Sequence, residues 1–256
     1  MRFSLEGKKA VVTGASRGIG RGIAIGFAEQ GADVVLASRS VAELEETKAG
    51  VEAHGRRAVV AETDFMDLAR AALPIQVALD QLGGLDILVN NAGGAGAYIE
   101  GGSEQLLDTP VEAMEAMMRL NVLAPAALAK RAAEALKDTG GGSIVNITST
   151  AAMVPRGHLH AYSAAKAAMA AFTFAWAESL GPYNIRVNAI APGGVMSGNL
   201  ARLVDTPEKR ATVEAKIPLG RIGEPTDAAA AAIFLASDEA AWVNGATILL
   251  SGGRIW

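Results

Sequence analysis

Two residues of a segment dominated by small apolar side chains could act together in proton transfer. The segment HAYSAAKAAMAAF (160–172) places Tyr162 and Lys166 four residues apart. If the segment is helical, both side chains leave the same face. A cation within about 4–6 Å lowers the pKa of a phenol from about 10. The pair is a candidate general acid or base acting on a carbonyl or an alcohol. Taken alone, it could also be a core tyrosine beside a solvent-reaching lysine.

A glycine-rich turn near the N-terminus could bind phosphate groups. The sequence TGASRGIG (13–20) has Gly14, Gly18 and Gly20 where a strand-like run meets a helix-like one. Glycines there let a pyrophosphate approach the helix N-terminus, whose free N–H groups favour anions. An ordinary strand–helix turn is the alternative. A second strand-like run about 20 residues further on favours a dinucleotide site.

The end of the second strand-like run indicates which dinucleotide the turn would bind. An NAD site favours an acidic residue there, to bond the ribose 2′-OH. This sequence has Ser38 and Arg39 instead, and Arg17 lies in the glycine-rich turn. Guanidinium groups suit the 2′-phosphate of NADP. We therefore predict a preference for NADP(H), with NAD(H) as the alternative and a surface role for Arg39 as the competing interpretation.

Strand-like and helix-like segments alternate along the chain. The strand-like runs are apolar throughout rather than alternating, which is typical of parallel strands covered on both faces. The alternation predicts an α/β fold, a Rossmann-like doubly wound parallel seven-stranded sheet with helices on both faces. No linker composition divides residues 1–256, so we expect a single domain. The expected strands are 9–14, 33–38, 57–64, 85–93, 142–149, 185–193 and 246–253, and the expected helices are 18–30, 40–54, 67–82, 109–138, 161–180 and 225–236.

Composition excludes several classes of function. The chain has 256 residues, a formal net charge of −4 and no cysteine, so it offers no thiolate metal site and no basic surface for nucleic acid or anionic membrane. No apolar run reaches the roughly 20 residues that a membrane span needs. His158 and His160 are two residues apart and His54 is remote, without carboxylates at ligand spacing. We expect no metal site and a soluble, cytoplasmic protein.

Five segments, in this order and spacing, resemble the short-chain dehydrogenase/reductase family. They are TGASRGIG (13–20), NNAG (90–93), ITS ending at Ser149, YSAAK (162–166) and PGGVMS (192–197). The resemblance extends from the first strand to the terminal SGG. It implies a nicotinamide-dependent oxidoreductase that interconverts a carbonyl and a secondary alcohol by hydride transfer.

The resemblance also implies roles for four residues. Tyr162 would donate the proton to the substrate carbonyl, and Lys166 would lower the pKa of that tyrosine and bond the nicotinamide ribose. Ser149 would orient the carbonyl oxygen. Asn121, in the segment MRLNVLA, would hold a water molecule of a proton relay.

Cofactor contacts follow from the same resemblance. Asp64 would bond the adenine amine, and the segment 192–197 would approach the carboxamide. Ser197 stands where the family often has threonine, which keeps the hydroxyl group. The expected cofactor-binding residues are Gly14, Ser16, Arg17, Gly18, Ile19, Gly20, Ser38, Arg39, Asp64, Phe65, Asn91, Ala92, Gly93, Tyr162, Lys166, Pro192, Gly193, Val195 and Ser197.

The substrate side is less defined. The tract 93–110 is longer and richer in glycine than in many relatives, and a lid is expected over about 195–217. The apolar lid residues favour a partly hydrophobic substrate, or simply pack the lid. Arg156, His158 and His160 could meet a carboxylate or belong to a solvated loop. The apolar lid residues are Met196, Leu200, Leu203, Val204, Val213 and Ile217.

Several functions remain open within and beyond this family. The preferred one is an NADPH-dependent carbonyl reductase or alcohol dehydrogenase acting on a small molecule. A 3-oxoacyl-carrier-protein reductase and a hydroxysteroid-type dehydrogenase are alternatives, although TGGGS (139–143) and LGPYN (180–184) lack the basic residues that would receive an acidic carrier. A non-catalytic dinucleotide sensor is disfavoured because both Tyr162 and Lys166 are present. Relatives pair their two long helices between subunits, which implies a homotetramer or homodimer here.

Overall fold

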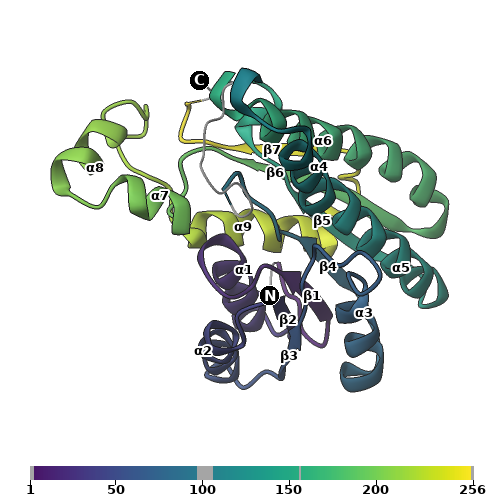
Figure 1. The fold of residues 1–256 in the computed structure, drawn as a ribbon. Helices are drawn as coiled ribbons and strands as arrows, with labels where there is room; N and C mark the ends of the chain where they lie inside the picture. The colour runs from purple at the N-terminus through teal and green to yellow at the C-terminus, as the bar shows by residue number, and fades with distance from the viewer. Residues whose placement is uncertain (1–2, 97–105, 156, 255–256) are drawn as a thin grey trace.

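The computed structural model describes residues 3–96, 106–155 and 157–254. Its seven strands form one parallel sheet in the order β3-β2-β1-β4-β5-β6-β7, with the order reversing direction between β1 and β4. This confirms the Rossmann-like sheet expected from the alternating segments (Figure 1). The strands are β1 (Lys9–Thr13), β2 (Asp33–Ser38), β3 (Ala58–Glu62), β4 (Ile87–Asn90), β5 (Gly142–Ile147), β6 (Ile185–Pro192) and β7 (Thr247–Leu250).

Helices cover both faces of the sheet and form two separate cores. One core joins the sheet to α1, α2 and α9, with Phe27 and Leu235 fully buried. The other joins it to α3, α5 and α6, with Ile75 and Leu128 inside. In Figure 1, α7 and α8 project to the left of this body. The helices are α1 (Gly18–Glu29), α2 (Val41–Glu52), α3 (Leu73–Val77), α4 (Val111–Met118), α5 (Ala124–Asp138), α6 (His160–Leu180), α7 (Gly198–Leu203), α8 (Pro207–Glu214) and α9 (Pro225–Ala236).

The helix expected over 67–82 starts later than its pattern suggests. Residues 66–72 form turns, and helix α3 begins only at Leu73. The carboxylates of Asp64 and Asp67 accept hydrogen bonds from the backbone N–H groups two residues on, at 3.0 and 3.1 Å. Such local bonds compete with helix formation. Pro74, in the first turn of α3, then suits a helix start because its missing N–H is not needed there.

The helix expected over 109–138 is interrupted where a functional residue was predicted. Residues Arg119–Leu123 form a π-helical turn between α4 and α5. The side-chain amide of Asn121 donates to the carbonyl of Met117 at 3.1 Å. Pro125 has no N–H for the carbonyl of Asn121, so the α-helical ladder cannot continue unchanged. The deviation therefore centres on Asn121.

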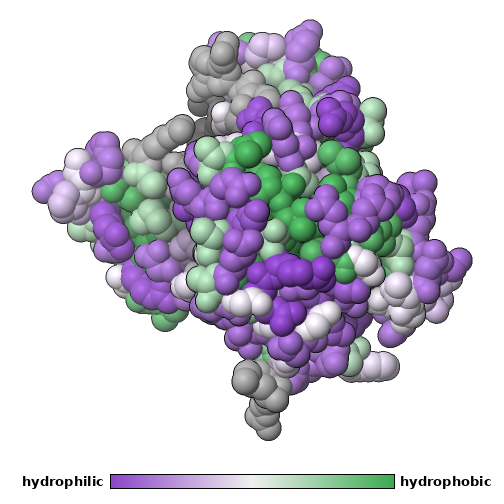
Figure 2. Space-filling model, turned by 90° about the horizontal axis from the view of Figure 1, so that it is seen from below, coloured by the Kyte–Doolittle hydropathy of each residue, from purple (hydrophilic) through white to green (hydrophobic). Residues whose placement is uncertain are grey.

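The β3 edge of the sheet is partly apolar. Figure 2 views the molecule from below, the side on which α2 and α3 lie in Figure 1, and hydrophobic residues gather there in a patch bordered by hydrophilic ones. Val59 and Val60 of the edge strand β3 are only half-buried. Glu62 ends the strand in solvent, and such a charge at an edge disfavours pairing with another sheet.

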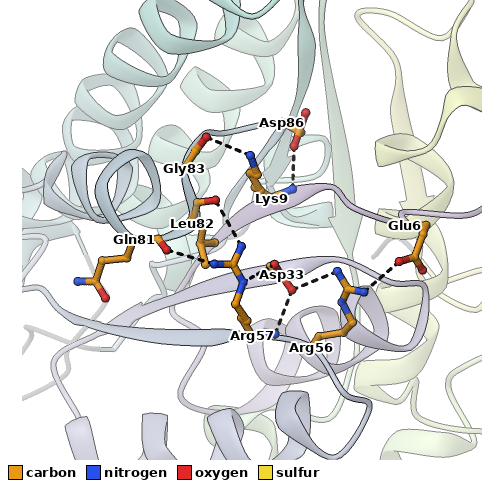
Figure 3. A network of polar contacts seen from close by, with 9 residues as sticks. All are labelled: Glu6, Lys9, Asp33, Arg56, Arg57, Gln81, Leu82, Gly83 and Asp86. Carbon is orange, nitrogen blue, oxygen red and sulfur yellow. Dashed lines mark hydrogen bonds and ion pairs between the residues drawn. The ribbon is translucent and has the colours of Figure 1, made fainter.

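An ionic network holds the amino ends of the strands together (Figure 3). Asp33 accepts hydrogen bonds from the backbone N–H and the Nε of Arg57, at 3.0 and 2.8 Å. Arg56 lies 3.2 Å from the same carboxylate and 3.0 Å from Glu6. Burial opposes ionisation of Asp33, but the Arg57 hydrogen bonds and the Arg56 charge outweigh it and lower its pKa.

Replacing Asp33 is therefore expected to destabilise the protein. Asp33→Asn would remove the carboxylate partner of Arg57 and one of the two carboxylates near Arg56, and lower the free energy of unfolding by about 2 kcal/mol at pH 7. Because the folded-state pKa is depressed, this stabilisation is present above the ordinary pKa near 3.8 and is lost as pH falls. Urea unfolding at pH 7 and pH 3 measures both effects. A difference between the two proteins that stayed constant with pH would contradict the electrostatic origin.

Candidate active site

The predicted site residues gather around one cavity of about 950 Å³. It lies beyond the carboxyl ends of the strands, where ligands of such folds bind. Three predicted residues do not line it: Gly20, Asp64 and Asn121. The predicted residues in the lining are Gly14, Ser16, Arg17, Gly18, Ile19, Ser38, Arg39, Phe65, Asn91, Ala92, Gly93, Ser149, Tyr162, Lys166, Pro192, Gly193, Val195 and Ser197.

The glycine-rich turn has the backbone that a phosphate site requires. Gly14 and Gly18 have φ values of 65° and 55°, which side chains disfavour. A Cβ at Gly14 would also lie 2.7 Å from the amide nitrogen of Asn91. That amide donates to the carbonyls of Thr13 and Gly14, at 2.8 and 3.2 Å, and so holds the turn. No side chain caps the first turn of α1, whose N–H groups suit an anion.

The adenosine end of the cavity carries positive charge at its rim. Arg17, before α1, and Arg39, after β2, are both exposed and line the cavity. The hydroxyl of Ser38 accepts a hydrogen bond from the N–H of Ser40 at 3.2 Å, which fixes the turn between β2 and α2. The sequence motif does not include Ser40 or Glu43, yet both line the cavity from the start of α2. The signal for them was their position one and four residues after Arg39.

The reactive end of the cavity is carried by α6, which a chain of buried amides ties to the sheet. The amide of Asn90 in β4 donates to Asn146 in β5 at 2.9 Å. Asn146 in turn donates to the hydroxyl of Thr173 in α6 at 2.9 Å. These hydrogen bonds connect the sheet to the helix, so they fix the position of α6 relative to the ends of the strands. Tyr162 lies in the first turn of α6 and Lys166 in the second.

Three side chains meet at this end. The Nζ of Lys166 lies 5.7 Å from the centre of the Tyr162 ring and donates to the carbonyl of Ile147 at 2.9 Å. The hydroxyl of Ser149, just beyond β5, lies close enough to the Tyr162 phenol to act on its pKa in the lowering direction. The same hydroxyl accepts from the N–H of Ala151 at 3.1 Å, which orients it. The fold therefore brings Ser149 next to Tyr162 and Lys166. Tyr162 and Lys166 are one helical turn apart, whereas Ser149 comes from a different segment of the chain.

The pKa of the phenol differs from the expectation. Burial raises the pKa of Tyr162 above 10, and the Ser149 hydroxyl opposes that rise. Burial also lowers the pKa of Lys166 to about 8. In the chain by itself, the net shift of the Tyr162 pKa is therefore upward, opposite to the expected direction, because burial has the largest effect. A positive charge within the cavity, such as an oxidised nicotinamide carries, would act in the lowering direction.

The buried lysine predicts a pH-dependent stability. Its folded-state pKa of about 8 lies below the ordinary 10.5, so the unfolded chain binds more protons between these values and stability rises with pH. Relative to Lys166→Met, the free energy of unfolding of the wild type should increase by about 2 kcal/mol between pH 8 and pH 10. Denaturant unfolding without cofactor measures this. A parallel pH dependence in the two proteins would show that Lys166 is not the titrating group.

Asn121 lies behind the cavity wall. It is fully buried, its side-chain oxygen accepts from the N–H of Gly94 at 3.0 Å, and its amide also contacts the sulfur of Met117 at 3.1 Å. A Cβ at Gly93 would lie 2.5 Å from that oxygen and 3.4 Å from the Nζ of Lys166. Asn121 thus holds the backbone that separates it from Lys166. Its role in a proton relay stays a prediction.

Gly20 and Asp64 have local structural partners. A Cβ at Gly20 would collide with the carbonyl of Gly14, so this glycine permits the glycine-rich turn to pack on α1. Asp64 caps the turn that follows β3 through the N–H of Met66. Their predicted contacts with a cofactor therefore have no support from the cavity lining.

The lid region mostly packs on itself. Val204 and Ile217 are buried with Ile222, and Met196, Leu200 and Val213 pack against them. Leu200 and Leu203 line the cavity. His160 contacts the hydroxyl of Thr109 at 3.3 Å. Arg156, the side chain of His158 and residues 97–105 of the glycine-rich tract lie outside the described residues.

Comparison with known proteins identifies the family. The family model described as enoyl-(acyl carrier protein) reductase matches residues 14–254. The L-rhamnose 1-dehydrogenase (NAD(P)(+)) of Sphingomonas sp. (strain SKA58) is 38% identical over 252 residues, which cover 97% of this chain and 96% of that protein. The chain belongs to the short-chain dehydrogenase/reductase family.

Other members of the short-chain dehydrogenase/reductase family match over nearly the whole chain. The 7alpha-hydroxysteroid dehydrogenase of Escherichia coli (strain K12) is 36% identical over 251 residues, 98% of this chain and 95% of that protein. A solved structure of a 7 alpha-hydroxysteroid dehydrogenase, complexed with NADH and 7-oxo glycochenodeoxycholic acid, superposes with a TM-score of 0.90 at 35% identity, covering 98% and 95% of the two chains. These relatives are oxidoreductases of alcohols and carbonyls.

The described residues contain no group of three or more histidine, cysteine or acidic side chains arranged to hold a metal ion. No helix in the described part of this family member is long and apolar enough to cross a membrane.

Proposed function

We propose that this protein is an NADP(H)-dependent oxidoreductase that interconverts a carbonyl and a secondary alcohol. The observation that carries the proposal is the convergence of Ser149, Tyr162 and Lys166 on a cavity that continues to the glycine-rich turn. Family membership supports the reaction type. The positive φ angles of Gly14 and Gly18 and the uncapped start of α1 fit a dinucleotide pyrophosphate.

In this proposal Tyr162 is the general acid and base. Its phenol gives a proton to the substrate oxygen during reduction and accepts one during oxidation. The Ser149 hydroxyl, which lies beside the phenol, orients the same oxygen. A bound nicotinamide would supply or accept the hydride. Lys166 is buried and has a pKa of about 8, so it can pass a proton onward near neutral pH.

The preference for NADP(H) rests on Arg17 and Arg39. Both guanidinium groups are exposed at the adenosine end of the cavity, where a 2′-phosphate would accept planar hydrogen bonds. The relatives include one that uses NAD(P)(+) by name and one crystallised with NADH, so the family alone does not select the cofactor.

An apolar ketone is the substrate class that the lining supports. Sugars need several hydrogen-bond partners. Among the described residues of the reactive end, Thr148 and Lys166 already donate to backbone carbonyls, which leaves mainly Ser149 and Tyr162 for a substrate. This favours a hydroxysteroid-type dehydrogenase over a sugar dehydrogenase. A 3-oxoacyl-carrier-protein reductase has less support, because segments 139–143 and 180–184 carry no basic residue. The apolar lining residues include Gly94, Ala95, Leu120, Leu159, Leu200 and Leu203.

The test is a substrate panel followed by NADPH and NADH oxidation at neutral pH. The panel contains ketosteroids, 3-oxoacyl thioesters, small α-diketones and keto sugars. We expect NADPH-dependent turnover, fastest with a hydrophobic ketone. Tight NADPH binding without turnover of any class would favour the sensing alternative, and turnover of keto sugars alone would contradict the apolar substrate class.

We further propose that the protein is a homotetramer, with a homodimer as the alternative. Phe172 and Trp176 stack on α6 with ring centres 4.9 Å apart, and the Phe172 ring is partly exposed. Phe174 is 68% and Trp242 99% exposed, which is unusual for large apolar side chains of a monomer. Sedimentation velocity tests this, and a monomer at micromolar concentration would contradict it. Cytoplasmic location stays a prediction.

A further inference from the structure

An acidic residue that the motifs do not include lines the adenosine end of the cavity. Glu43, in the first turn of α2, borders the same space as Ser38, Arg39 and Ser40. It is half-buried. Among the described lining residues it is the only carboxylate, and the cations of the lining are Arg17, Arg39 and Lys166. The proposed 2′-phosphate site thus contains a negative charge as well as two positive ones.

The backbone of Glu43 is fastened to the glycine-rich turn. Arg21, on α1, donates from Nη2 to the carbonyl of Glu43 at 3.2 Å and from Nε to the carbonyl of Ser16 at 3.0 Å. Thr47, which is fully buried, donates to the carbonyl of Ala15 at 3.0 Å and accepts from Arg21 at 3.1 Å. The first turn of α2 therefore cannot move away from the glycine-rich turn without breaking several hydrogen bonds, of which the one from Thr47 to Ala15 is buried.

A purely structural role accounts for only part of this arrangement. An acidic residue in the first turn stabilises a helix through the positive end of its dipole, and Ser40 makes no side-chain cap that would replace this. That role needs a carboxylate anywhere in the first turn. It does not need one that faces the cavity beside Arg39.

We propose that Glu43 is a specificity-determining residue that lowers the preference for NADPH over NADH. A 2′-phosphate carries nearly two negative charges at neutral pH, and the carboxylate repels it. The neutral 2′-OH of NADH suffers no repulsion and can donate a hydrogen bond to a carboxylate. Arg17 and Arg39 act in the opposite direction. The cavity is therefore built to accept both dinucleotides, with the balance set by Glu43. This inference rests on the proposed dinucleotide site.

Glu43→Gln tests the inference with two probes that need no turnover. Adenosine 2′,5′-bisphosphate and AMP differ only in the 2′-phosphate, and calorimetry gives the Kd of each. Removing the charge should lower the Kd of the bisphosphate by about fivefold, because it removes a Coulomb repulsion at a partly solvated site. The Kd of AMP should change by less than about twofold. The NADPH-to-NADH ratio of kcat/KM should rise by the same factor.

The matched control is Glu45→Gln. Glu45 is an exposed acid of the same helix that contacts Lys48 at 3.7 Å and does not line the cavity. The substitution Glu45→Gln should leave the Kd values of both probes unchanged. An equal gain in this control, or an equal change for both probes in Glu43→Gln, would overturn the inference. If Glu43→Gln melts well below the wild type, Glu43→Ser removes the same charge with a residue suited to helix starts, and the same selective gain is required.

The inference and the proposed function fail in different ways. A wild type that binds AMP as tightly as the bisphosphate would refute the NADP(H) preference, yet a selective gain in Glu43→Gln would still support the role of Glu43. A wild type that prefers the bisphosphate, with no selective gain in the variant, would refute the role of Glu43 alone.

Discussion

Tyr162→Phe is expected to lower kcat by about 10³-fold while changing the Kd for NADPH by less than about twofold. The substitution removes one oxygen, the only group of the side chain that can exchange a proton with the substrate. The ring itself packs with Met117, Val122, Ala165 and Met169, and phenylalanine keeps that packing. Removing the phenol also removes a buried polar group, so the thermal midpoint should not fall.

Kinetics with the preferred ketone and fluorescence titration with NADPH measure the two effects separately. Tyr183→Phe is the matched control, because Tyr183 is exposed beside Lys137 and lies outside the cavity lining. It should retain wild-type kcat. Wild-type turnover in Tyr162→Phe would refute the proposed mechanism, whatever the substrate.

Arg39→Asp should reverse the cofactor preference. The NADPH-to-NADH ratio of kcat/KM is expected to fall by about 100-fold, because the variant loses charge-assisted hydrogen bonds to the 2′-phosphate and gains a like charge beside it. NADH should be used as well as before or better. The side chain is exposed, so the substitution should cost little stability.

Arg70→Asp makes the same change of charge at an exposed residue outside the cavity lining. Its effect on the NADPH-to-NADH ratio of kcat/KM measures the contribution of the protein's overall electrostatic field. That effect should be less than about twofold. An unchanged ratio in Arg39→Asp would mean that Arg17 binds the phosphate without help. A fall of similar size in both variants would mean that no specific contact exists.

The destabilising features of the site agree with the proposed chemistry. Burial disfavours the charged forms of both Lys166 and Tyr162. Groups with shifted pKa values near one another are common where protons are transferred. The stability that Lys166 costs near neutral pH is the physical reason to expect that this position serves activity rather than folding.

Local patterns were sufficient for the architecture. Apolar runs predicted all seven strands because a strand buried on both faces requires apolar residues at every position. The i, i+4 spacing of Tyr162 and Lys166 depends only on helix geometry, and the structure keeps it. The glycine-rich turn could also be predicted from the sequence, because its backbone conformation and close contacts exclude side chains at Gly14.

Local competition explains where the helix boundaries were wrong. Residues 67–72 carry a helix-like pattern, but the carboxylates of Asp64 and Asp67 bond the backbone in turns instead. The π-helical turn at Asn121 arises because its amide competes for a carbonyl of its own helix. Periodicity describes which face is buried, and it contains no information about such bonds.

The sequence by itself determined the sheet, the glycine-rich turn and the tyrosine–lysine pair, since each depends on residues close together in the chain. Only the tertiary structure decided the direction of the Tyr162 pKa, the enclosure of Asn121 behind Gly93 and the presence of Glu43 in the cavity lining. The physical reason is common to all three. Burial and electrostatic field at a side chain are set by segments that are distant in sequence, and these meet only when the strands align.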